Sequence, residues 1–584
     1  MRKLLTALAT VFLLMATVFG FGVATDVAHA ETVYKGYGYS TITDPSQKTM
    51  YEELSAKSED THISGEDVEI MEFDTGDGKI NHAVAFDYDF ASAGLTLQQA
   101  QSVWATFRND NPQYYWLSGT LIYSPTHLYI VCDSEYASAS ERARCNAIIA
   151  SEVARYTSLT AGLSTKLDKA LAVHDDICNR IAYAYKADGI TPSDDAFAHN
   201  VMGVFENRSA VCEGYAKAYQ LIMTELGIDS IYVTGISRGV GHSWNMVKLD
   251  DGLWHWVDVT WDDPVNIAGY IHQYFGLSRT EFASDHTPNT STPAPDGFMD
   301  YLYPLPTVSD QSISLTKLYK DGSYVGCYDS VSSALAGITD ANGSYKIELL
   351  TTTAPHKIGG AMPKAKRIDF VSADNYGAVL TLNADVTFDG NVGFERVSLM
   401  TTNSYGINVG GNTVYVGKGF VPGDVVFKGG CSVEFAQGVD TVRNSDVKCF
   451  PEAKRIKLPS SVSLLGNQTF MDNTALEYIE VADGNRYYKS VDGVLFSADG
   501  KALIKYPSSM AGASYSVPRG VTEIKDNAFY GVRNLTKVVI PYGVTTLGNN
   551  AFAQSTSLTA VYAPSTVTQV GTENPFANSP ALQL

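Results

Sequence analysis

Apolar residues in the first half of the chain recur at the spacings of helices and strands. Between Leu167 and Ile181 they lie three and four positions apart, which predicts an amphipathic helix. A second helix is expected at 212–226, which lacks proline, contains good helix formers and is followed by Gly227 as a stop. Runs of β-branched and aromatic residues predict strands at 231–233, 243–249 and 253–261. The pattern favours a mixed α+β fold for this half.

The pattern changes near residue 308. From there to about 448, short apolar runs alternate with Gly, Asn and Asp, as in Val379-Leu380-Thr381-Leu382. Many short strands with frequent turns are typical of a β-sandwich or a β-solenoid. Of these two folds, the pattern favours the solenoid.

The last part of the chain, 449–584, contains an internal repeat. Apolar positions at 521, 524, 529, 535 and 538 recur 23 residues later, at 544, 547, 552, 558 and 561. Another copy begins at Val462 and a further one at Val567. A period in the twenties with Leu and Ile at fixed offsets predicts a leucine-rich solenoid, in which each turn buries its apolar face against the next. The array resembles the leucine-rich repeats of bacterial surface antigens.

Length, charge and the first thirty residues narrow the class of protein. A chain of 584 residues exceeds the usual size of one core, and a net charge of −21 argues against nucleic-acid binding. Residues 1–30 have the features of a signal peptide, with Arg2, Lys3, an apolar run and Ala28-His29-Ala30 as the cleavage signal. The alternative is an uncleaved membrane anchor. We therefore expect a secreted or extracellular protein, in the second case one held at the cell surface.

The cysteines indicate one reactive thiol. Seven is an odd number for an exported chain, so at least one cysteine stays outside any disulfide in a monomer. Cys212 is the candidate, because at the start of the predicted helix the N–H groups and the helix dipole favour a thiolate. The neighbouring Gly214 is expected to leave room for a substrate backbone. No Cys-x-x-Cys pair occurs, and we expect no metal site and no cofactor.

A histidine and an aspartate downstream complete the set that acyl transfer through a thioester needs. His242 follows Gly239 and Gly241, which suggests a turn or mobile loop that presents the imidazole. Asp258 is flanked by tryptophans and requires a hydrogen-bonding partner, for which His242 on an adjacent strand is suited. Alternatively, Asp258 caps the turn at 262–264 or is exposed. His174 is expected to be an ordinary surface histidine.

These runs resemble the core of the transglutaminase-like superfamily, a relative of the papain-like fold. The resemblance covers roughly residues 165–290. It implies that Cys212 is the nucleophile, His242 the general base and acid, and Asp258 the residue that orients the imidazole. The first oxyanion donor would be the backbone N–H of Cys212, and Asn200 and Asn207 are candidates for the second. The matching segments are 211–216, 241–245, 256–264 and 274–278.

The sequence therefore predicts a multidomain protein. Its expected parts are a signal peptide (1–30), an α+β module (31–160), a transglutaminase-like catalytic domain (161–307), a β-rich region (308–448) and a leucine-rich repeat domain (449–584). The expected function is a secreted or cell-surface cysteine acyltransferase that cross-links or deamidates proteins. Two alternatives stay open: a papain-like protease or amidase with the same triad, and a surface adhesin or scaffold with an inactive core. The expected partners are protein or peptide substrates, recognised at Gln or Lys side chains or at peptide bonds, and a host or cell-wall protein bound by the repeats.

Overall fold

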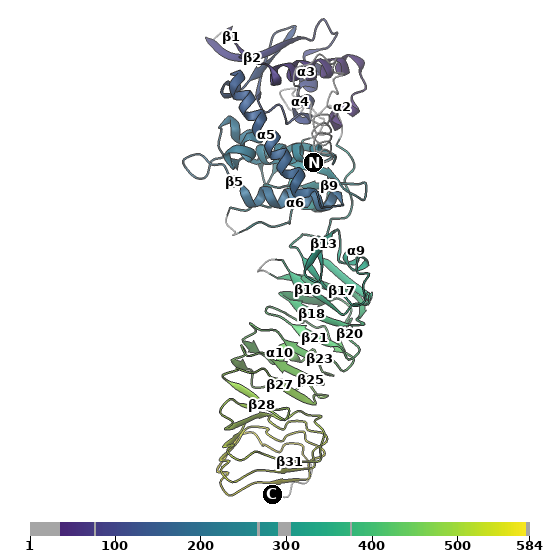
Figure 1. Cartoon of the computed structure of the whole chain (residues 1–584), viewed down its shortest axis with the longest axis vertical. Coiled ribbons are helices and arrows are strands. Elements are labelled where there is room, and N and C mark those ends of the chain that lie inside the picture. Colours follow the sequence, from purple (N-terminus) through teal and green to yellow (C-terminus); the bar gives the residue numbers. More distant parts are fainter. Residues whose placement is uncertain (1–35, 75–77, 266–268, 290–304, 374–376, 580–584) are drawn as a thin grey trace, which may run out of the picture.

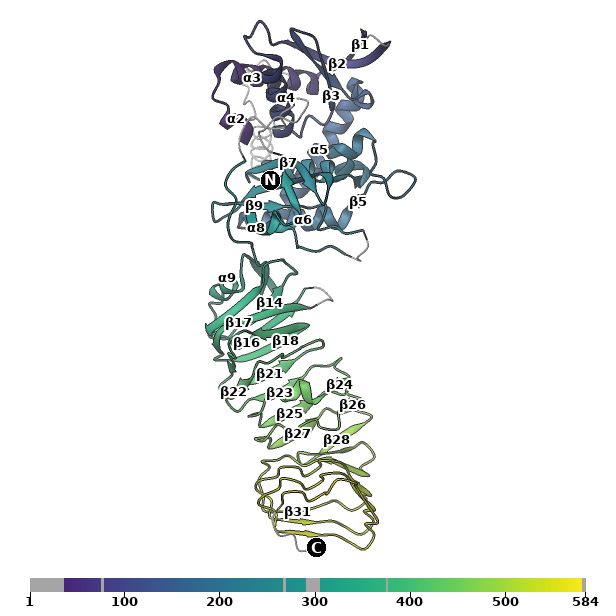
Figure 2. The same cartoon turned by 180° about the vertical axis from the view of Figure 1, so that it is seen from behind.

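The computed structural model describes residues 36–74, 78–265, 269–289, 305–373 and 377–579. The predicted signal peptide lies outside these residues. The molecule is elongated: a globular part continues into a long stack of strands that ends near the C-terminus (Figure 1, and from behind in Figure 2). Within the described ranges, no helix combines the length and apolarity required to cross a membrane.

The first segment of the globular part packs helices against a four-stranded antiparallel sheet in the order β1-β2-β4-β3. Asp44 caps one of these helices, and Thr96 forms a capping box with Gln99 at the start of another. The elements are α2 (Tyr37–Thr41), α3 (Pro45–Ile63), β1 (Glu69–Asp74), β2 (Lys79–Asp89), α4 (Leu97–Asp110), β3 (Leu117–Tyr123), β4 (His127–Cys132) and α5 (Ala139–Thr160).

The second segment contains the two predicted helices, which are confirmed as α6 (Lys166–Arg180) and α7 (Cys212–Glu225). They lie beside a five-stranded antiparallel sheet in the order β10-β9-β8-β7-β11. The prediction of a strand at 253–261 was too long, because β9 ends at Val257. The remaining elements are β5 (Ala182–Tyr183), β6 (Ser209–Ala210), β7 (Ser230–Ser237), β8 (Val240–Lys248), β9 (Trp254–Val257), β10 (Phe275–Leu277), α8 (Arg279–Phe282) and β11 (His286–Pro288).

One hydrophobic core joins these two segments and reaches into the strands that follow. Trp104 of α4 and Tyr219 of α7 belong to the same cluster of buried residues as Ile313, Leu315 and Leu350. The predicted domain limits at 160 and 307 fall in connecting segments, but packing crosses both of them. The globular part and the beginning of the solenoid therefore stabilise each other.

The region from 316 to 481 is a solenoid, so the alternative of a β-sandwich is wrong. Its main sheet has the order β13-β12-β14-β16-β18-β21-β23-β25-β27, and the strands pair in parallel from β14 onward. The ladder continues without a break past residue 448 into the repeats. The strands are β12 (Thr316–Lys320), β13 (Ser323–Tyr328), β14 (Ser344–Leu349), β16 (Arg367–Ser372), β18 (Asn391–Glu395), β21 (Thr413–Val416), β23 (Ser432–Phe435), β25 (Arg455–Leu458) and β27 (Tyr478–Val481).

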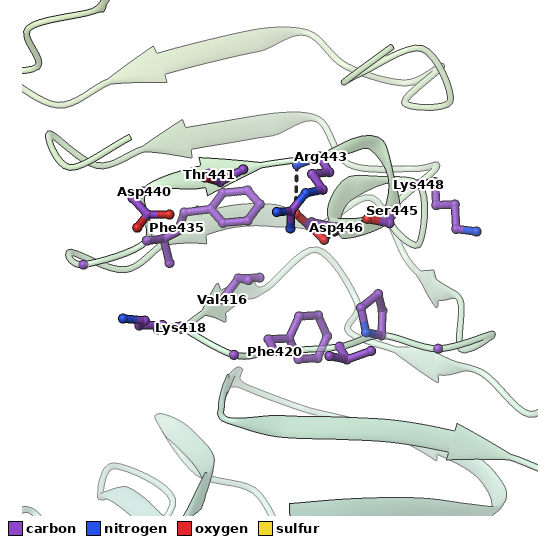
Figure 3. A pocket seen from close by; sticks show the side chains of 17 residues that line it. Val416, Lys418, Phe420, Phe435, Asp440, Thr441, Arg443, Ser445, Asp446 and Lys448 are labelled. Atoms are coloured by element: carbon purple, nitrogen blue, oxygen red, sulfur yellow. Dashed lines mark hydrogen bonds between the residues drawn. The ribbon is translucent and has the colours of Figure 1, made fainter. Parts of the chain in front are cut away.

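Smaller sheets and two short helices close the other faces of the solenoid. They comprise α9 (Val331–Ala336), β15 (His356–Ala361), β17 (Ala378–Thr387), β19 (Val397–Thr401), β20 (Ile407–Asn408), β22 (Phe427–Lys428), β24 (Thr441–Val442), α10 (Asn444–Val447) and β26 (Leu464–Leu465). A cleft of about 540 Å³ opens between the turns at 416–423 and 435–448, beside Phe420, Phe435 and Arg443 (Figure 3). It contains none of the predicted site residues.

The C-terminal repeats stack with the predicted period. Phe529 and Phe552, 23 positions apart, are parallel with ring centroids 4.8 Å apart, and Phe576 stacks on Phe552 at 5.4 Å. Buried apolar positions of successive turns form one cluster, as the repeat predicted. The strands are β28 (Tyr488–Val491), β29 (Val494–Ser497), β30 (Ala502–Lys505), β31 (Ser514–Ser516), β32 (Glu523–Ile524), β33 (Lys537–Val539), β34 (Thr546–Leu547), β35 (Ala560–Tyr562) and β36 (Gln569–Val570).

Candidate active site

Cys212 is the first residue of α7, and it differs from the other cysteines in its exposure. All seven cysteines lie in the described ranges as free thiols, and Cys212 alone is not buried. The thiol therefore lies where the helix dipole and the N–H groups of the first turn favour a negative charge. Gly214 has another role than predicted: a Cβ there would lie 2.5 Å from the carbonyl oxygen of Ala198, so this glycine permits close packing of α7 rather than substrate access.

His242 lies within β8, just after a turn at Arg238 and Gly239, so the predicted turn is present and the alternative of a mobile loop is wrong. Its ring reaches Asp258, the first residue after β9, with 2.7 Å between Nε2 and Oδ2. The other oxygen of Asp258 accepts the backbone N–H groups of Thr260 and Trp261, each at 3.1 Å. Asp258 is fully buried. It pairs with the histidine and caps the backbone at 260–261 rather than the turn at 262–264, and the prediction that it is exposed was wrong.

Burial and charge act in opposite directions on this pair. Burial by itself would lower the pKa of His242, but attraction to Asp258 and hydrogen bonds to Asp258 and Cys212 raise it to about 10. Burial by itself would raise the pKa of Asp258, but His242, and then His286, lower it to about 2. His242 is therefore the positively charged imidazolium at neutral pH in the resting site, within reach of the Cys212 thiol. The structure thus brings together the three residues that the sequence predicted.

His286 is a neighbour of this group that sequence reasoning missed. Its Nε2 lies 3.1 Å from Oδ2 of Asp258, and its Nδ1 lies 2.7 Å from Asp285. The ring is fully buried and stacks on Phe282 with centroids 4.1 Å apart. No motif marks His286 in the sequence. It reaches the site because β11, although distant along the chain from β7, pairs with it.

Tyr183 is a second missed neighbour. The pairing of β5 with β6 places Tyr183 opposite Ala210, two residues before the cysteine. Burial raises the pKa of Tyr183, and its hydroxyl lies within hydrogen-bonding reach of both the thiol and the backbone of Cys212. A tyrosine 29 positions upstream of Cys212 carried no signal in the sequence. The short β5–β6 pair supplies the contact.

The asparagines that the sequence offered as oxyanion donors hold local structure instead. The amide of Asn200 donates to Ala196 and Tyr136, and its oxygen accepts the backbone N–H of Met202. The amide of Asn207 donates to the carbonyl of Met202. Both side chains are therefore occupied away from the thiol.

The first turn of α7 is fixed by a buried carboxylate. Glu213 pairs with Arg108 of α4 at 2.8 Å, with Lys217 at 2.7 Å and with Nδ1 of His199 at 3.0 Å. Burial by itself would raise the pKa of Glu213, but Lys217, His199 and Arg108 hold it well below its usual range. The N-terminal segment thus supports the helix that presents the thiol.

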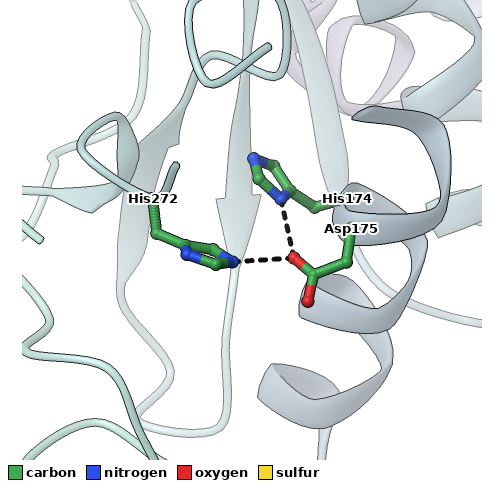
Figure 4. A group of neighbouring side chains, drawn as sticks. All are labelled: His174, Asp175 and His272. Atoms are coloured by element: carbon green, nitrogen blue, oxygen red, sulfur yellow. Dashed lines mark hydrogen bonds and ion pairs between the residues drawn. The ribbon is translucent and has the colours of Figure 1, made fainter. Parts of the chain in front are cut away.

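Among the residues that the structure describes, two groups of side chains could hold a metal ion: His242 with Asp258 and His286, and His174 with Asp175 and His272. The second group corrects another prediction. His174 is fully buried rather than at the surface. Its Nδ1 faces Asp175 (Figure 4), and its Nε2 faces Asp262. No local pattern connects residue 174 with residue 272.

Comparison with known proteins agrees with this architecture. Residues 153–259 match the family model of the transglutaminase-like superfamily. Residues 423–510 and 454–583 match the BspA type leucine rich repeat region, in six copies. The chain therefore contains a transglutaminase-like core followed by BspA-type leucine-rich repeats. This architecture indicates a cysteine enzyme in general, joined to a β-rich repeat region.

Individual relatives cover only parts of the chain. The kyphoscoliosis peptidases of Mus musculus and Homo sapiens are each 27% identical to it, over 142 and 144 residues, which is 21% of this chain and 21% of each relative. The chain thus matches about a fifth of the length of these curated relatives. Among solved structures, the pneumococcal vaccine antigen PcpA is 19% identical, with a TM-score of 0.27 over 40% of this chain and 68% of that one. A TGase structure is 18% identical, with a TM-score of 0.20 over 26% and 47%.

Proposed function

We propose that this protein is a secreted or cell-surface cysteine enzyme that transfers acyl groups from protein carboxamides through a thioester on Cys212. The observation that carries the proposal is the buried His242–Asp258 pair, 2.7 Å between Nε2 and Oδ2, beside a thiol at the start of a helix. This combination favours a thiolate and gives it a proton donor and acceptor.

The chemistry follows from the positions of the atoms. The thiolate of Cys212 attacks the carboxamide carbon, and a tetrahedral oxyanion forms. Since Nε2 of His242 is held by Asp258, Nδ1 is the nitrogen that exchanges protons at the thiol. The imidazolium protonates the leaving nitrogen, so the C–N bond breaks and ammonia departs. His242 then takes a proton from the incoming amine or water, which attacks the thioester; the C–S bond breaks, and the thiolate and the imidazolium are restored.

We assign the oxyanion site to the backbone N–H of Cys212 and the hydroxyl of Tyr183. The hydroxyl lies against both the backbone and the thiol of Cys212, where negative charge develops on the carbonyl oxygen. A donor placed at that point stabilises the transition state more than the substrate. Replacing Tyr183→Phe should lower kcat roughly 10²-fold while the thiol remains reactive. Tyr185→Phe is the matched control, because its ring lies beside Tyr183 with centroids 4.9 Å apart.

Labelling with iodoacetamide tests the nucleophile. We expect one rapidly labelled cysteine in the folded wild type, no rapid labelling in Cys212→Ala, and unchanged labelling in Cys431→Ala, whose thiol is buried in the solenoid. Amide turnover should disappear only in the Cys212 variant. If the wild-type protein neither reacts with iodoacetamide nor turns over amides, the proposed enzymatic function is rejected.

A second candidate reaction is peptide-bond cleavage, favoured by the matched relatives that are named peptidases. The same acyl-enzyme forms, but the leaving group is a peptide amine and water always resolves the thioester. Mass spectrometry of a peptide mixture containing Gln and Lys distinguishes a cross-link, a deamidated glutamine and a cleaved chain. If the products contain cleaved chains but no cross-links and no deamidated glutamine, the protein is a protease and not an acyltransferase to amines.

The repeats extend far from Cys212, and we propose that they bind a host or cell-wall protein and so position the enzyme on its substrate. Leucine-rich solenoids offer long continuous surfaces for proteins. If Cys212→Ala still binds cells while turnover is lost, both roles are present. Binding without any turnover in the wild type would support a surface adhesin with an inactive core.

A further inference from the structure

The His174 cluster lies where α6, the segment after β9 and the first solenoid strands meet. Oδ1 of Asp175 lies 3.1 Å from Nδ1 of His174 and 2.8 Å from Nε2 of His272 (Figure 4). The other ring nitrogen of His174 lies 3.1 Å from Asp262. His174 and Asp262 are fully buried, and His272 is 7% exposed. Three potential ligand atoms therefore converge on one point.

We propose that Nδ1 of His174, Oδ1 of Asp175 and Nε2 of His272 bind one divalent transition-metal ion of the zinc class. Imidazole and carboxylate are the ligands that such ions take, at about 2.0–2.2 Å. Two bonds of that length at a tetrahedral angle place the ligand atoms about 3.4 Å apart. The observed separations of 3.1 and 2.8 Å need to open only by a few tenths of an ångström to about half an ångström.

The surroundings of His174 suit a ligand. Asp262 accepts from Nε2, which keeps the proton on that nitrogen and leaves the lone pair of Nδ1 for the metal. Asp262 is itself held by the backbone N–H of Tyr274, at 2.9 Å. On binding, the proton that Nδ1 shares with Asp175 passes to solvent, and a metal–nitrogen bond takes its place.

The carboxylates of the cluster provide negative charge for a bound cation. Asp175 and Asp262 bring two carboxylates into a largely buried space, and within the described residues the ammonium group that pairs with them is Lys317, 3.1 Å from Oδ2 of Asp175. The side chain of Asp175 is 14% exposed, which gives an ion access to the cluster and leaves a coordination position for water.

Such an ion would connect the solenoid to the proposed catalytic residues. The backbone N–H of His272 donates to Thr351 of the solenoid, and Lys317 lies on β12. The backbone N–H of Asp262 donates to the carbonyl of Asp258 at 3.2 Å. The metal would therefore brace the loop that carries Asp258 against the first turns of the solenoid. Its role is structural and does not depend on the cysteine chemistry.

The test uses the full chain with Cys212→Ala, which removes the reactive thiol, and His286→Gln, which removes one potential ligand of the group His242, Asp258 and His286. This background protein is stripped with a chelator, dialysed, and titrated with Zn²⁺ by calorimetry. We expect one equivalent to bind and to raise Tm. In that background His272→Gln should weaken binding at least about 100-fold, and Asp262→Asn, which keeps the shape of the side chain, about 10–100-fold. The matched control is His255→Gln, a buried histidine paired with Asp251 outside the cluster, which should leave binding unchanged.

Co²⁺ identifies the ligands directly. The cluster predicts visible absorption of a nitrogen–oxygen site without a thiolate band, since Cys178 lies beside His174 but donates its S–H to Val259. A thiolate band would overturn the assigned ligands. Absence of Zn²⁺ binding in the folded background protein, or equal binding in the His272→Gln and His255→Gln variants, would overturn the site.

Discussion

The globular part and the repeat part of this molecule bury different kinds of side chains. In the repeats, stacked apolar side chains such as Phe529 and Phe552 form the core, and neighbouring turns pair through parallel backbone ladders. In the globular part, ionisable groups such as His174, Asp258 and Asp262 are fully buried beside the apolar core. Buried charges require partners from several elements at once. A repeating stack contacts only its neighbours, so it does not bring several distant segments to one point.

This difference indicates that an active site can form in the globular part, where several segments meet, and not in the repeats. The proposed active site draws its residues from α7, β8, the end of β9, β11 and β5. One five-stranded sheet brings β8, β9 and β11 together, and the separate β5–β6 pair places Tyr183 beside the start of α7. The solenoid provides length and surface. Changes at the junction between the globular part and the solenoid give the strongest test of this division of roles.

Shortening the chain should give the largest effect. A chain that ends after 307 loses Ile313, Leu315 and Leu350 from the shared core, so we expect it to lose cooperative unfolding and rapid selective labelling of Cys212. A chain that ends after 483 keeps that core and should retain both. All six tryptophans lie between residues 104 and 261, so their fluorescence reports the globular part alone. Equal behaviour of the two shortened chains would show that the solenoid is dispensable to the globular part.

A cavity in the repeats should destabilise only the repeats. Phe529 is fully buried between stacked rings, so Phe529→Ala should cost about 3–5 kcal/mol. Circular dichroism, which also sees the solenoid, should show an earlier urea transition, while tryptophan fluorescence should not change. The control is Tyr542→Ala, at a position that is 81% exposed. A matching shift in fluorescence would mean that the two parts unfold as one unit.

One buried lysine should make the stability of the repeats depend on pH. Lys505 is 3% exposed and donates to the carbonyls of Asn527 and Tyr530, and burial lowers its pKa to about 7. Between this value and the ordinary lysine pKa of about 10.4, the unfolded chain binds the extra proton, so stability should rise with pH. The slope is about 1.4 kcal/mol per pH unit at most, or 2–3 kcal/mol from pH 7.5 to 9.5.

Lys505→Met should abolish this slope. Urea unfolding followed by circular dichroism at the two pH values measures it. An identical slope in the variant would assign the pH dependence to other groups.

The smallest effect is expected from the second histidine of the active site. Nε2 of His286 lies 3.1 Å from Oδ2 of Asp258, the oxygen that also pairs with His242, so the two rings share one carboxylate oxygen. His286→Gln removes the imidazole from this shared contact, so that Oδ2 of Asp258 interacts mainly with His242. The pKa of His242 should rise further, the alkaline limb of kcat/KM should move to higher pH, and activity at neutral pH should fall about tenfold. With His255→Gln as control, a loss of activity without a shift of the limb would limit His286 to a structural role.

Local patterns in the sequence predicted much of the fold and of the candidate active site. Helical spacing predicted α6, and helix-forming residues followed by Gly227 predicted α7, each within about one residue at its ends. The period of 23 residues predicted the stacked turns, because each turn repeats the same short-range packing. Residue types in familiar runs suggested Cys212, His242 and Asp258 together. The pattern also predicts room for a substrate at Gly214, but there the glycine permits close packing of α7 against Ala198.

The sequence by itself determined the periodic features of this protein and the residue types of its proposed chemistry, because both depend on neighbours within a few positions. The tertiary structure alone decided that Tyr183 and His286 flank that chemistry and that His174 meets His272. It also decided that the first solenoid strands complete the globular core. These contacts join segments tens to more than a hundred positions apart, and the order in which strands pair, rather than any local pattern, brings them together.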